Sequence, residues 1–344
     1  MCITVVFFHL SLLDEALVTE MVFNFIRDSP GRGVELTRGF LRSNSVIVTR
    51  EHVRDLVRTL DPEGTELRKR KTIRRRVYQS NGIHHVWHMD GWHKLIKYGL
   101  VIHAAVDDGS RYVVFSQCSS NNQALTVLRW FLGACEELEV IPGSIRTDKG
   151  GENVQVFRFM MMVYNDDSSC FKASSSCHNQ PIERNWRDMR NSTMQPYKDF
   201  FFMLESLGMD VDNSIHMFCL HYLFVPRINE SLQEFRSSWN NHGLSTERYK
   251  SPLSILFSER ATIGGVQWVA EDMQKIIEEV LSTATDYDLR QVHCAPRCCP
   301  LNERQSDIFC AHVQPFTLKD SLQDLASPFF AIVDYTIHLL ESIV

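Results

Sequence analysis

Apolar residues recur at helical spacing through the first part of the chain. A loose apolar stripe predicts one helix over residues 14–30, and the segment SPGRG breaks it. Apolar positions around Phe40 continue the helical spacing in a second short helix. A third helix begins after Thr49, a good N-cap residue, and ends where an Asp-Pro pair and a glycine follow. We therefore expect a small helical unit over residues 1–64.

The chain opens on an apolar run, MCITVVFFHLSLL. This run is too short to span a bilayer. It also lacks the basic start and the small-residue cleavage site of a signal peptide. We expect it to form a buried helix or strand, and we expect no membrane association.

The pattern changes from residue 84 onward, where short runs are rich in apolar and aromatic residues. HVWHMDGWHKL, GLVIHAAVDD and RYVVFSQC are each predicted to form a strand, and the DDGS turn joins the second to the third. This order predicts an antiparallel meander of three strands.

The apolar spacing switches to that of a helix over residues 121–139. Further along, IPGSIRTD and CFKASSS are predicted strands, each followed by a helix, the last of which Pro196 is expected to kink. The order of strands and helices predicts an α/β domain over residues 84–262, with a mixed five-stranded sheet flanked by helices. Residues 263–344 are less regular, and we expect them to be mostly helical or irregular.

Charge is unevenly spread along the chain. The sequence is 44% hydrophobic, and its net charge of -6 does not by itself indicate a nucleic-acid partner. Residues 65–83, however, form a basic linker. Its run RKRKTIRRR holds seven basic residues in nine, namely Arg68, Lys69, Arg70, Lys71, Arg74, Arg75 and Arg76. We expect the run to contact DNA phosphates or to act as a nuclear localisation signal, and a merely solvated linker is the alternative.

Two of the short N-terminal helices, separated by SNSVIV, fit a helix-turn-helix. The second of them carries Arg50, Arg54 and Arg58, which we expect to point outward and to dock on DNA through the groove. The alternative is a small helical cap with a solvated basic face.

Acidic residues are expected to meet at one edge of the predicted sheet. Asp90 lies within the first strand, in an otherwise apolar and aromatic stretch, and Asp148 ends the fourth strand. If these strands pair, the two carboxylates become neighbours, and Glu183 can reach the same edge from the helix after the fifth strand. Like charges this close need compensation. Carboxylates with open water positions suit Mg²⁺ or Mn²⁺, and two such ions can activate a water or hydroxyl for attack on a phosphodiester.

The surroundings of these acids resemble the DDE catalytic core of retroviral integrases and transposases, which has a ribonuclease H-like fold. The motifs are WHMDG for Asp90, IRTDKGGEN for Asp148 and HNQPIERNWRD for Glu183. Between the first two acids lie 57 residues, and between the last two lie 34, one fewer than is usual in the integrase family. The resemblance covers about residues 84–260. The motifs also look like those of transposon-derived integrase-core-domain proteins in animal and fungal genomes.

The resemblance implies a DNA recombinase of the DDE polynucleotidyl transferase type. Asp90, Asp148 and Glu183 would be its catalytic residues and would hold two Mg²⁺ or Mn²⁺ ions. Its partners would be double-stranded DNA and further copies of the chain, since integrase-like enzymes act as multimers on paired DNA ends. Its location would be the nucleus.

Neighbouring residues match the family one by one. Residues 150–153 match the turn after the second acid, which in the family lies beside the active site. Asn179 and Gln180 match the polar pair before the third acid and are expected near the substrate. Arg187 follows Glu183 by four residues, so it shares that helix face and can meet a phosphate. Because so few cysteines and histidines precede residue 50, we do not expect the His-His-Cys-Cys zinc domain of retroviral integrases, and the predicted helix-turn-helix would take over its DNA-docking role.

Other interpretations of the same residues differ in class. A domesticated DNA- or chromatin-binding protein would keep the fold without catalysis, and a ribonuclease acting on RNA–DNA hybrids is a third option. His88 shares the strand face of Asp90 and is a secondary candidate for a metal ligand. The cysteines of residues 293–312 lack paired CxxC spacing, so we expect a capped amphipathic helix from Pro300 in preference to a zinc site.

Overall fold

The computed structural model describes residues 15–29, 31–68, 82–148, 150–173, 180–258, 262–282 and 299–341. The apolar run at the start of the chain and all of the basic run beyond Arg68 lie outside these residues, so the expectations made for them stay predictions. Within the described ranges, no helix is both long and apolar enough to cross a membrane.

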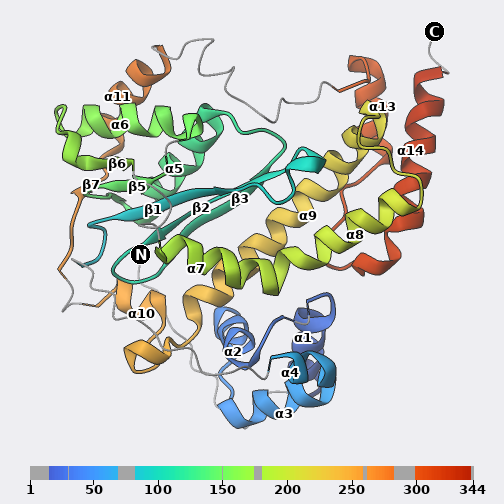
Figure 1. The fold of residues 1–344 in the computed structure, drawn as a ribbon, viewed down its shortest axis with the longest axis horizontal. Coiled ribbons are helices and arrows are strands. Elements are labelled where there is room, and N and C mark those ends of the chain that lie inside the picture. The colour runs from blue at the N-terminus through green and yellow to red at the C-terminus, as the bar shows by residue number, and fades with distance from the viewer. Residues whose placement is uncertain are drawn as a thin grey trace.

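A mixed five-stranded sheet forms the centre of the structure (Figure 1). Its strands are β1 (Trp87–Trp92), β2 (Val101–Asp107), β3 (Val113–Ser119), β5 (Ile145–Thr147) and β6 (Phe171–Ala173). They lie in the order β3-β2-β1-β5-β6, in which β1, β2 and β3 are antiparallel neighbours and β5 and β6 run parallel to β1. The predicted meander is confirmed, as is the ribonuclease H-like α/β class. A separate short pair consists of β4 (Val140–Ile141) and β7 (Val266–Gln267).

Helices cover both faces of the sheet (Figure 1). One face carries α5 (Ala124–Leu138), α6 (Val154–Val163) and α11 (Ala270–Ser282). The other carries α7 (Gln180–Met189), α8 (Gln195–Ser206) and α9 (Ser214–Asn241). Three further helices follow, namely α10 (Pro252–Leu256), α13 (Glu303–His312) and α14 (Ala326–Glu341), and α10 and α14 contact α9. A π-helical turn (Arg190–Met194) joins α7 to α8, so the predicted kink falls just before Pro196, which lies in the first turn of α8.

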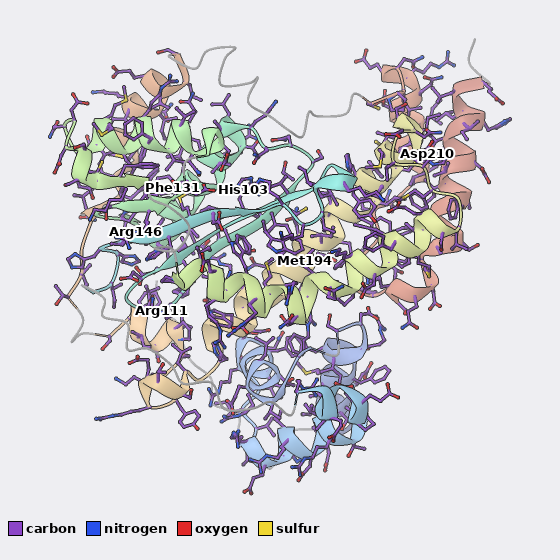
Figure 2. All side chains as sticks on the ribbon, viewed as in Figure 1. His103, Arg111, Phe131, Arg146, Met194 and Asp210 are labelled. Carbon is purple, nitrogen blue, oxygen red and sulfur yellow. The ribbon has the colours of Figure 1, made fainter. Side chains whose placement is uncertain are left out.

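Strand alternation divides the buried residues of β1 between two cores. Trp87 and Met89 pack with Phe131 of α5 on one face of the sheet. Trp92 packs with Met194 on the other face, and Figure 2 labels Phe131 and Met194 on the two sides. Asp90 shares the alternation of Trp92, so its side chain faces the helices α7 to α9.

Within the described ranges, four helices precede the sheet. They are α1 (Glu15–Arg27), α2 (Val34–Ser43), α3 (Arg50–Leu60) and α4 (Pro62–Leu67). The predicted cap of α3 is confirmed, because the Thr49 hydroxyl accepts the backbone N–H of His52 at 3.3 Å. The Asp-Pro pair does end α3, but it also begins α4. Asp61 caps α4 by accepting the backbone N–H of Gly64, and Pro62 occupies the first turn, where its missing N–H costs nothing.

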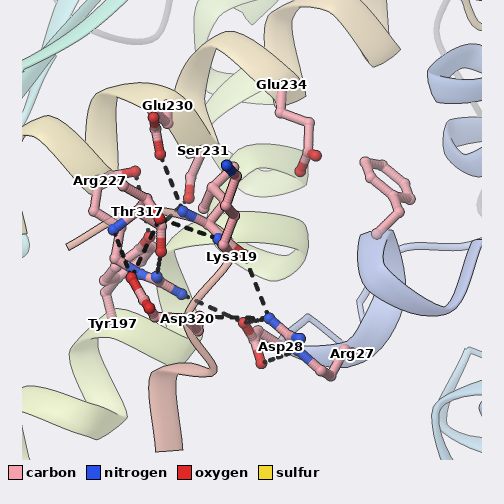
Figure 3. A network of polar contacts seen from close by, with 12 residues as sticks. Arg27, Asp28, Tyr197, Arg227, Glu230, Ser231, Glu234, Thr317, Lys319 and Asp320 are labelled. Carbon is pink, nitrogen blue, oxygen red and sulfur yellow. Dashed lines mark hydrogen bonds and ion pairs between the residues drawn. The ribbon is translucent and has the colours of Figure 1, made fainter. Parts of the chain in front are cut away.

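A polar network links the N-terminal helices to α9 and to the segment before α14 (Figure 3). At its centre, Arg227 of α9 is 1% exposed. Its guanidinium donates to the carbonyl of Thr317 and lies 3.4 Å from a carboxylate oxygen of Asp28, which follows α1. Asp28 in turn pairs with Arg27 at 3.2 Å. Buried charges are tolerated only when they are paired in this way, so the network fixes how the first helices sit on the core.

Arg32 makes a second link between the N-terminal helices and the core. Its guanidinium donates to Glu234 of α9 at 2.7 Å and to the carbonyl of Ser192 at 3.0 Å, and it lies 4.2 Å from the centre of the Phe25 ring. We expect Arg32→Lys to lower the free energy of unfolding by about 1–2 kcal/mol, because an ammonium keeps the charge but loses the planar stacking and one of these hydrogen bonds. Urea unfolding measures the change.

A matched control is Arg184→Lys. Arg184 also pairs with a carboxylate, that of Asp188 at 2.7 Å, but its side chain is 48% exposed. Exposed pairs contribute little, so this substitution should change stability by no more than about 0.5 kcal/mol. Equal costs for the two substitutions would contradict the role assigned to Arg32.

Candidate active site at the β1–β5 edge

The carboxylate of Asp90 is held on the α7 side of the sheet by two donors. One oxygen accepts the backbone N–H of Gly91 at 2.9 Å, and the other accepts the indole N–H of Trp186, on α7, at 2.8 Å. Trp186 is itself nearly buried, so this second bond forms in a largely dry environment. The orientation of Asp90 is therefore set by its own strand and by the helix that carries Glu183.

Asp90 and Asp148 are brought together by the parallel pairing of β1 with β5. Burial raises the pKa of the Asp90 carboxyl to about 6, the hydrogen bond from Trp186 opposes that rise, and the nearby charge of Asp148 adds to it. One oxygen of Asp148 is buried without a hydrogen-bond partner among the described residues. Two neighbouring carboxylates, one of them incompletely satisfied, are what the sequence predicted for this edge.

Glu152 extends the acidic surroundings of Asp148. It lies in the turn that follows β5, where its carboxylate accepts the amide of Asn153 at 3.1 Å. Burial raises the pKa of Glu152, and the charge of Asp148 acts in the same direction. His93, just past the end of β1, acts on both Glu152 and Asp90 in the opposite direction. The turn at residues 150–153 thus lies within electrostatic reach of the acid pair.

Glu183 takes a different position from the other two predicted acids. It lies in the first turn of α7 and is exposed, one helical turn before Trp186, which bonds to Asp90. Among the residues that the structure describes, no three His, Cys, Asp or Glu side chains lie where they could share a metal ion. The structure therefore joins Asp90 to Asp148 and anchors the helix of Glu183 to them, without closing a group of three.

The other predicted residues of this helix are placed as follows. Arg187 is exposed, as its position four residues after Glu183 suggested. Gln180 begins α7, and Asn179 lies outside the described residues. The helix thus presents Arg187 to solvent, where a phosphate can approach it.

The three arginines predicted for DNA docking, Arg50, Arg54 and Arg58, lie along α3. All three line a cleft with a volume of about 2010 Å³ that α3 forms with α7 and with the segment after α9. Arg50 is tied to Glu35 of α2 at 2.6 Å. Arg68, the first residue of the basic run, lines the same cleft.

His88, a secondary metal candidate, has another partner in the structure, and the cysteines of residues 293–298 lie outside the described residues. His88 is fully buried, and its ring nitrogen lies 3.2 Å from a carboxylate oxygen of Asp108, away from Asp90 in the hydrogen-bond network. In the C-terminal region, the predicted capped helix is confirmed as α13. Asn302 and Gln305 form a reciprocal capping box at its start, and Phe309 is buried.

The sequence did not indicate a role in the site for two residues of α7. Trp186 bonds to Asp90, and its position three residues after Glu183 is the one signal that could have indicated a shared face. Asn185 is 1% exposed, and neither atom of its amide has a partner among the described residues. No sequence pattern marked Asn185, because its burial depends on elements distant in the chain.

The acid pair fits a divalent cation. Each oxygen of Asp90 accepts a single hydrogen bond and keeps free lone pairs, and one oxygen of Asp148 accepts none from the described residues. Mg²⁺ in proteins is commonly held by one or two carboxylates, with water and substrate phosphate completing the shell. A cation between the two carboxylates would also remove their mutual repulsion.

Fold and site together define a ribonuclease H-like domain with an acidic edge at β1 and β5. The integrase core domain family matches residues 77–266, which is more than half of the chain, and the protein belongs to that family. No curated protein matches the sequence. One similar solved structure is a chain in the cryo-electron microscopy structure of the simian T-cell lymphotropic virus intasome in complex with PP2A regulatory subunit B56 gamma. The identity is 15% and the TM-score 0.36, over 64% of this chain and 72% of that one.

The indole of Trp186 offers a direct test of this geometry. Trp186→Phe removes the donor that lowers the pKa of Asp90, so we expect that pKa to rise further above 6. Titration of the Asp90 carboxyl by NMR measures the change. Trp268→Phe is the matched control, because the buried indole N–H of Trp268 has no partner among the described residues. A pKa that stays at about 6 in Trp186→Phe would contradict the hydrogen bond.

Proposed function

We propose that the protein is a DNA recombinase that cuts and joins phosphodiester bonds with the help of Mg²⁺ or Mn²⁺. The observation that carries this proposal is the closeness of Asp90, on β1, to Asp148, which directly follows the adjacent parallel strand β5 of an integrase core domain. One oxygen of Asp148 has no hydrogen-bond partner among the described residues, and the pKa of Asp90 is raised. Both observations support a functional site in which a cation is bound by these carboxylates.

In this proposal Asp90 and Asp148 would hold the metal ions, and Glu183 would be the third ligand, contributed by α7. Ions bound there would supply activation of a water or 3′-hydroxyl nucleophile and stabilisation of the leaving oxygen. The side chains and backbone of the protein orient the metal ligand and the substrate. The N–H groups of Gly91 and Trp186 fix the Asp90 carboxylate, and Arg187 holds a phosphate on the exposed side of the same helix.

The proposed substrate is double-stranded DNA. Arg50, Arg54 and Arg58 on α3, together with the basic run from Arg68 to Arg76, would contact its backbone. We further propose that several copies of the chain assemble on paired DNA ends and that the protein works in the nucleus.

Nicking and strand transfer of end-labelled duplex DNA test this function. Products should form with Mn²⁺ or Mg²⁺, disappear when a chelator is added, and be lost in Asp148→Asn. Products that persist in the chelator would contradict a metal-dependent mechanism.

The exposed position of Glu183 favours one alternative, a protein that binds DNA through the same fold without cutting it. In that case the wild-type protein and Asp148→Asn would bind DNA equally well and with the same dependence on salt, and neither would form products with any metal.

A further inference from the structure

A deep cleft separates the N-terminal helices from the helix that carries Glu183. Its walls come from α2 and α3 on one side, and from α7 and the segment after α9 on the other. The volume of about 2010 Å³ exceeds the roughly 300–1,000 Å³ of ordinary small-molecule pockets. The cleft therefore suits part of a polymer better than a metabolite.

The charge on the cleft wall leaves two arginines uncompensated. Six arginines line the cleft, and four of them are paired with carboxylates, namely Arg50 with Glu35, Arg68 with Asp61, Arg111 with Asp108 and Arg184 with Asp188. Arg54 and Arg58, one turn apart on α3, form no ion pair with any described residue. Glu247 is the one acid on the wall that no described arginine pairs. Two neighbouring guanidinium groups without carboxylates are well suited to successive phosphates.

Asn185 provides an independent sign of a ligand on the opposite wall. This residue lines the cleft from α7 and is 1% exposed, yet both polar atoms of its amide lack partners among the described residues. A buried amide without hydrogen bonds is costly and rare in folded proteins. A ligand that enters the cleft can offer the missing donor and acceptor, and nucleic-acid bases carry both on their edges.

An aromatic ring stands at the third side of the cleft. Tyr249 lines it from the segment after α9 and is 59% exposed. The backbone φ of Tyr249 is 60°, and that of Arg248 is 53°, conformations that bulky residues rarely adopt. A hydrogen bond from the N–H of Tyr249 to the carbonyl of Leu244 holds this turn. The ring is thereby presented to the cleft and to solvent, where it can stack on a base.

We infer that the cleft binds a single strand of DNA. Arg54 and Arg58 hold its phosphates, Tyr249 stacks on an unpaired base, and the Asn185 amide hydrogen-bonds a base edge. A basic groove with an aromatic platform is the usual means of binding single strands, because only unpaired bases expose their ring faces. The inference rests on the proposed function, since it names the form in which the DNA substrate is held.

Binding of a labelled single-stranded DNA oligonucleotide by the full chain, measured by fluorescence anisotropy in a chelator, tests the cleft without requiring catalysis. Arg54→Gln and Arg58→Gln should each weaken binding and reduce the slope of log affinity against log salt by about 0.7. Tyr249→Ala should weaken binding by roughly tenfold or more and leave that slope unchanged. Asn185→Leu should lower the affinity without lowering the stability of the protein, because an apolar group of similar size removes an unsatisfied amide.

Matched controls lie away from the cleft. Arg129 is an exposed arginine on α5, on the opposite face of the sheet, and Phe257 is a 73% exposed ring outside the cleft lining. Arg129→Gln and Phe257→Ala should bind the oligonucleotide as the wild-type protein does. Equal losses in the controls and in the cleft variants would overturn the inference.

Two further outcomes separate this inference from the proposed function. If the cleft variants lose single-strand binding while the wild-type protein cuts no DNA, the cleft assignment stands and the recombinase proposal falls. If the protein cuts DNA but the cleft variants bind the single strand normally, or lose duplex binding to the same extent, the cleft assignment is overturned. Tighter binding of the matching RNA strand would also overturn it.

Discussion

Replacing Asp148 with asparagine is expected to lower the rate of metal-dependent DNA cutting by about a thousandfold or more. A bound cation contributes several kcal/mol to the transition state, and each 1.4 kcal/mol corresponds to about a tenfold change in rate. Asparagine keeps the shape of the side chain but removes the charge that would hold the cation beside Asp90. The rate of nicking of end-labelled duplex DNA with Mn²⁺ measures the loss.

The fold should survive this substitution. One oxygen of Asp148 is buried without a hydrogen-bond partner among the described residues, so changing that atom to an amide nitrogen breaks no hydrogen bond with them. Equal unfolding curves for the two proteins would show that the loss is chemical. Asp167→Asn, in an exposed turn, is the control and should cut DNA at the wild-type rate. Asp148→Asn protein that cuts DNA as fast as wild type would exclude Asp148 from the mechanism.

The sequence predicted the acid pair because the features that create it are local. The runs around Asp90 and Asp148 have the composition of strands, and the parallel pairing of β1 with β5 then brings the two carboxylates together. The start of α7 could be predicted in the same way. The direction in which Glu183 points could not, because the rotation of a helix is set by the residues packed beneath it, here Ile182 and Trp186.

The cleft could not be predicted from the sequence, for a related reason. Its walls come from segments far apart in the chain. They face one another because α2 packs on α9 and because Arg32 and Arg227 join the N-terminal helices to α9 and its neighbours. Arg50 and Glu35 illustrate the effect. They are 15 residues apart and pair across two helices, which leaves Arg54 and Arg58 as the arginines of α3 without an ion pair among the described residues. Charge patterns along one helix do not reveal such pairs.

Asp90 is expected to make the protein less stable as the pH rises toward neutrality. Burial above all, with the nearby charge of Asp148, raises the pKa of this carboxyl from 3.8 to about 6 in the folded protein. Between these values the folded chain binds a proton that the unfolded chain does not bind, so the free energy of unfolding falls with rising pH. The contribution is fully present below the lower value and lost above the higher one, a change of about 3 kcal/mol.

Urea unfolding between about pH 4 and about pH 7.5, in a chelator, measures this change against Asp90→Asn. The asparagine variant does not titrate, so it should gain about 2.5 kcal/mol relative to the wild-type protein across the interval, which begins just above the lower pKa value. Asp167→Asn is again the control. The hydrogen bond from the backbone of Ser169 lowers the pKa of Asp167, so its small contribution has the opposite sign. Parallel curves for wild type and Asp90→Asn would contradict the coupling of Asp90 to its surroundings.

Mg²⁺ should restore the free energy of unfolding that the protein loses when Asp90 becomes ionised. A cation that binds only the folded chain raises the free energy of unfolding by RT ln(1 + c/Kd), where c is the free Mg²⁺ concentration, and the ionised carboxylates of Asp90 and Asp148 are its proposed ligands. At neutral pH, millimolar Mg²⁺ should therefore stabilise the wild-type protein and leave Asp90→Asn nearly unchanged. An equal gain in both proteins would place the cation elsewhere. Stabilisation confined to the wild type would show that Mg²⁺ binds at this edge of the sheet. The two close carboxylates would then lower the stability of the metal-free protein at a site whose function is to bind a metal ion.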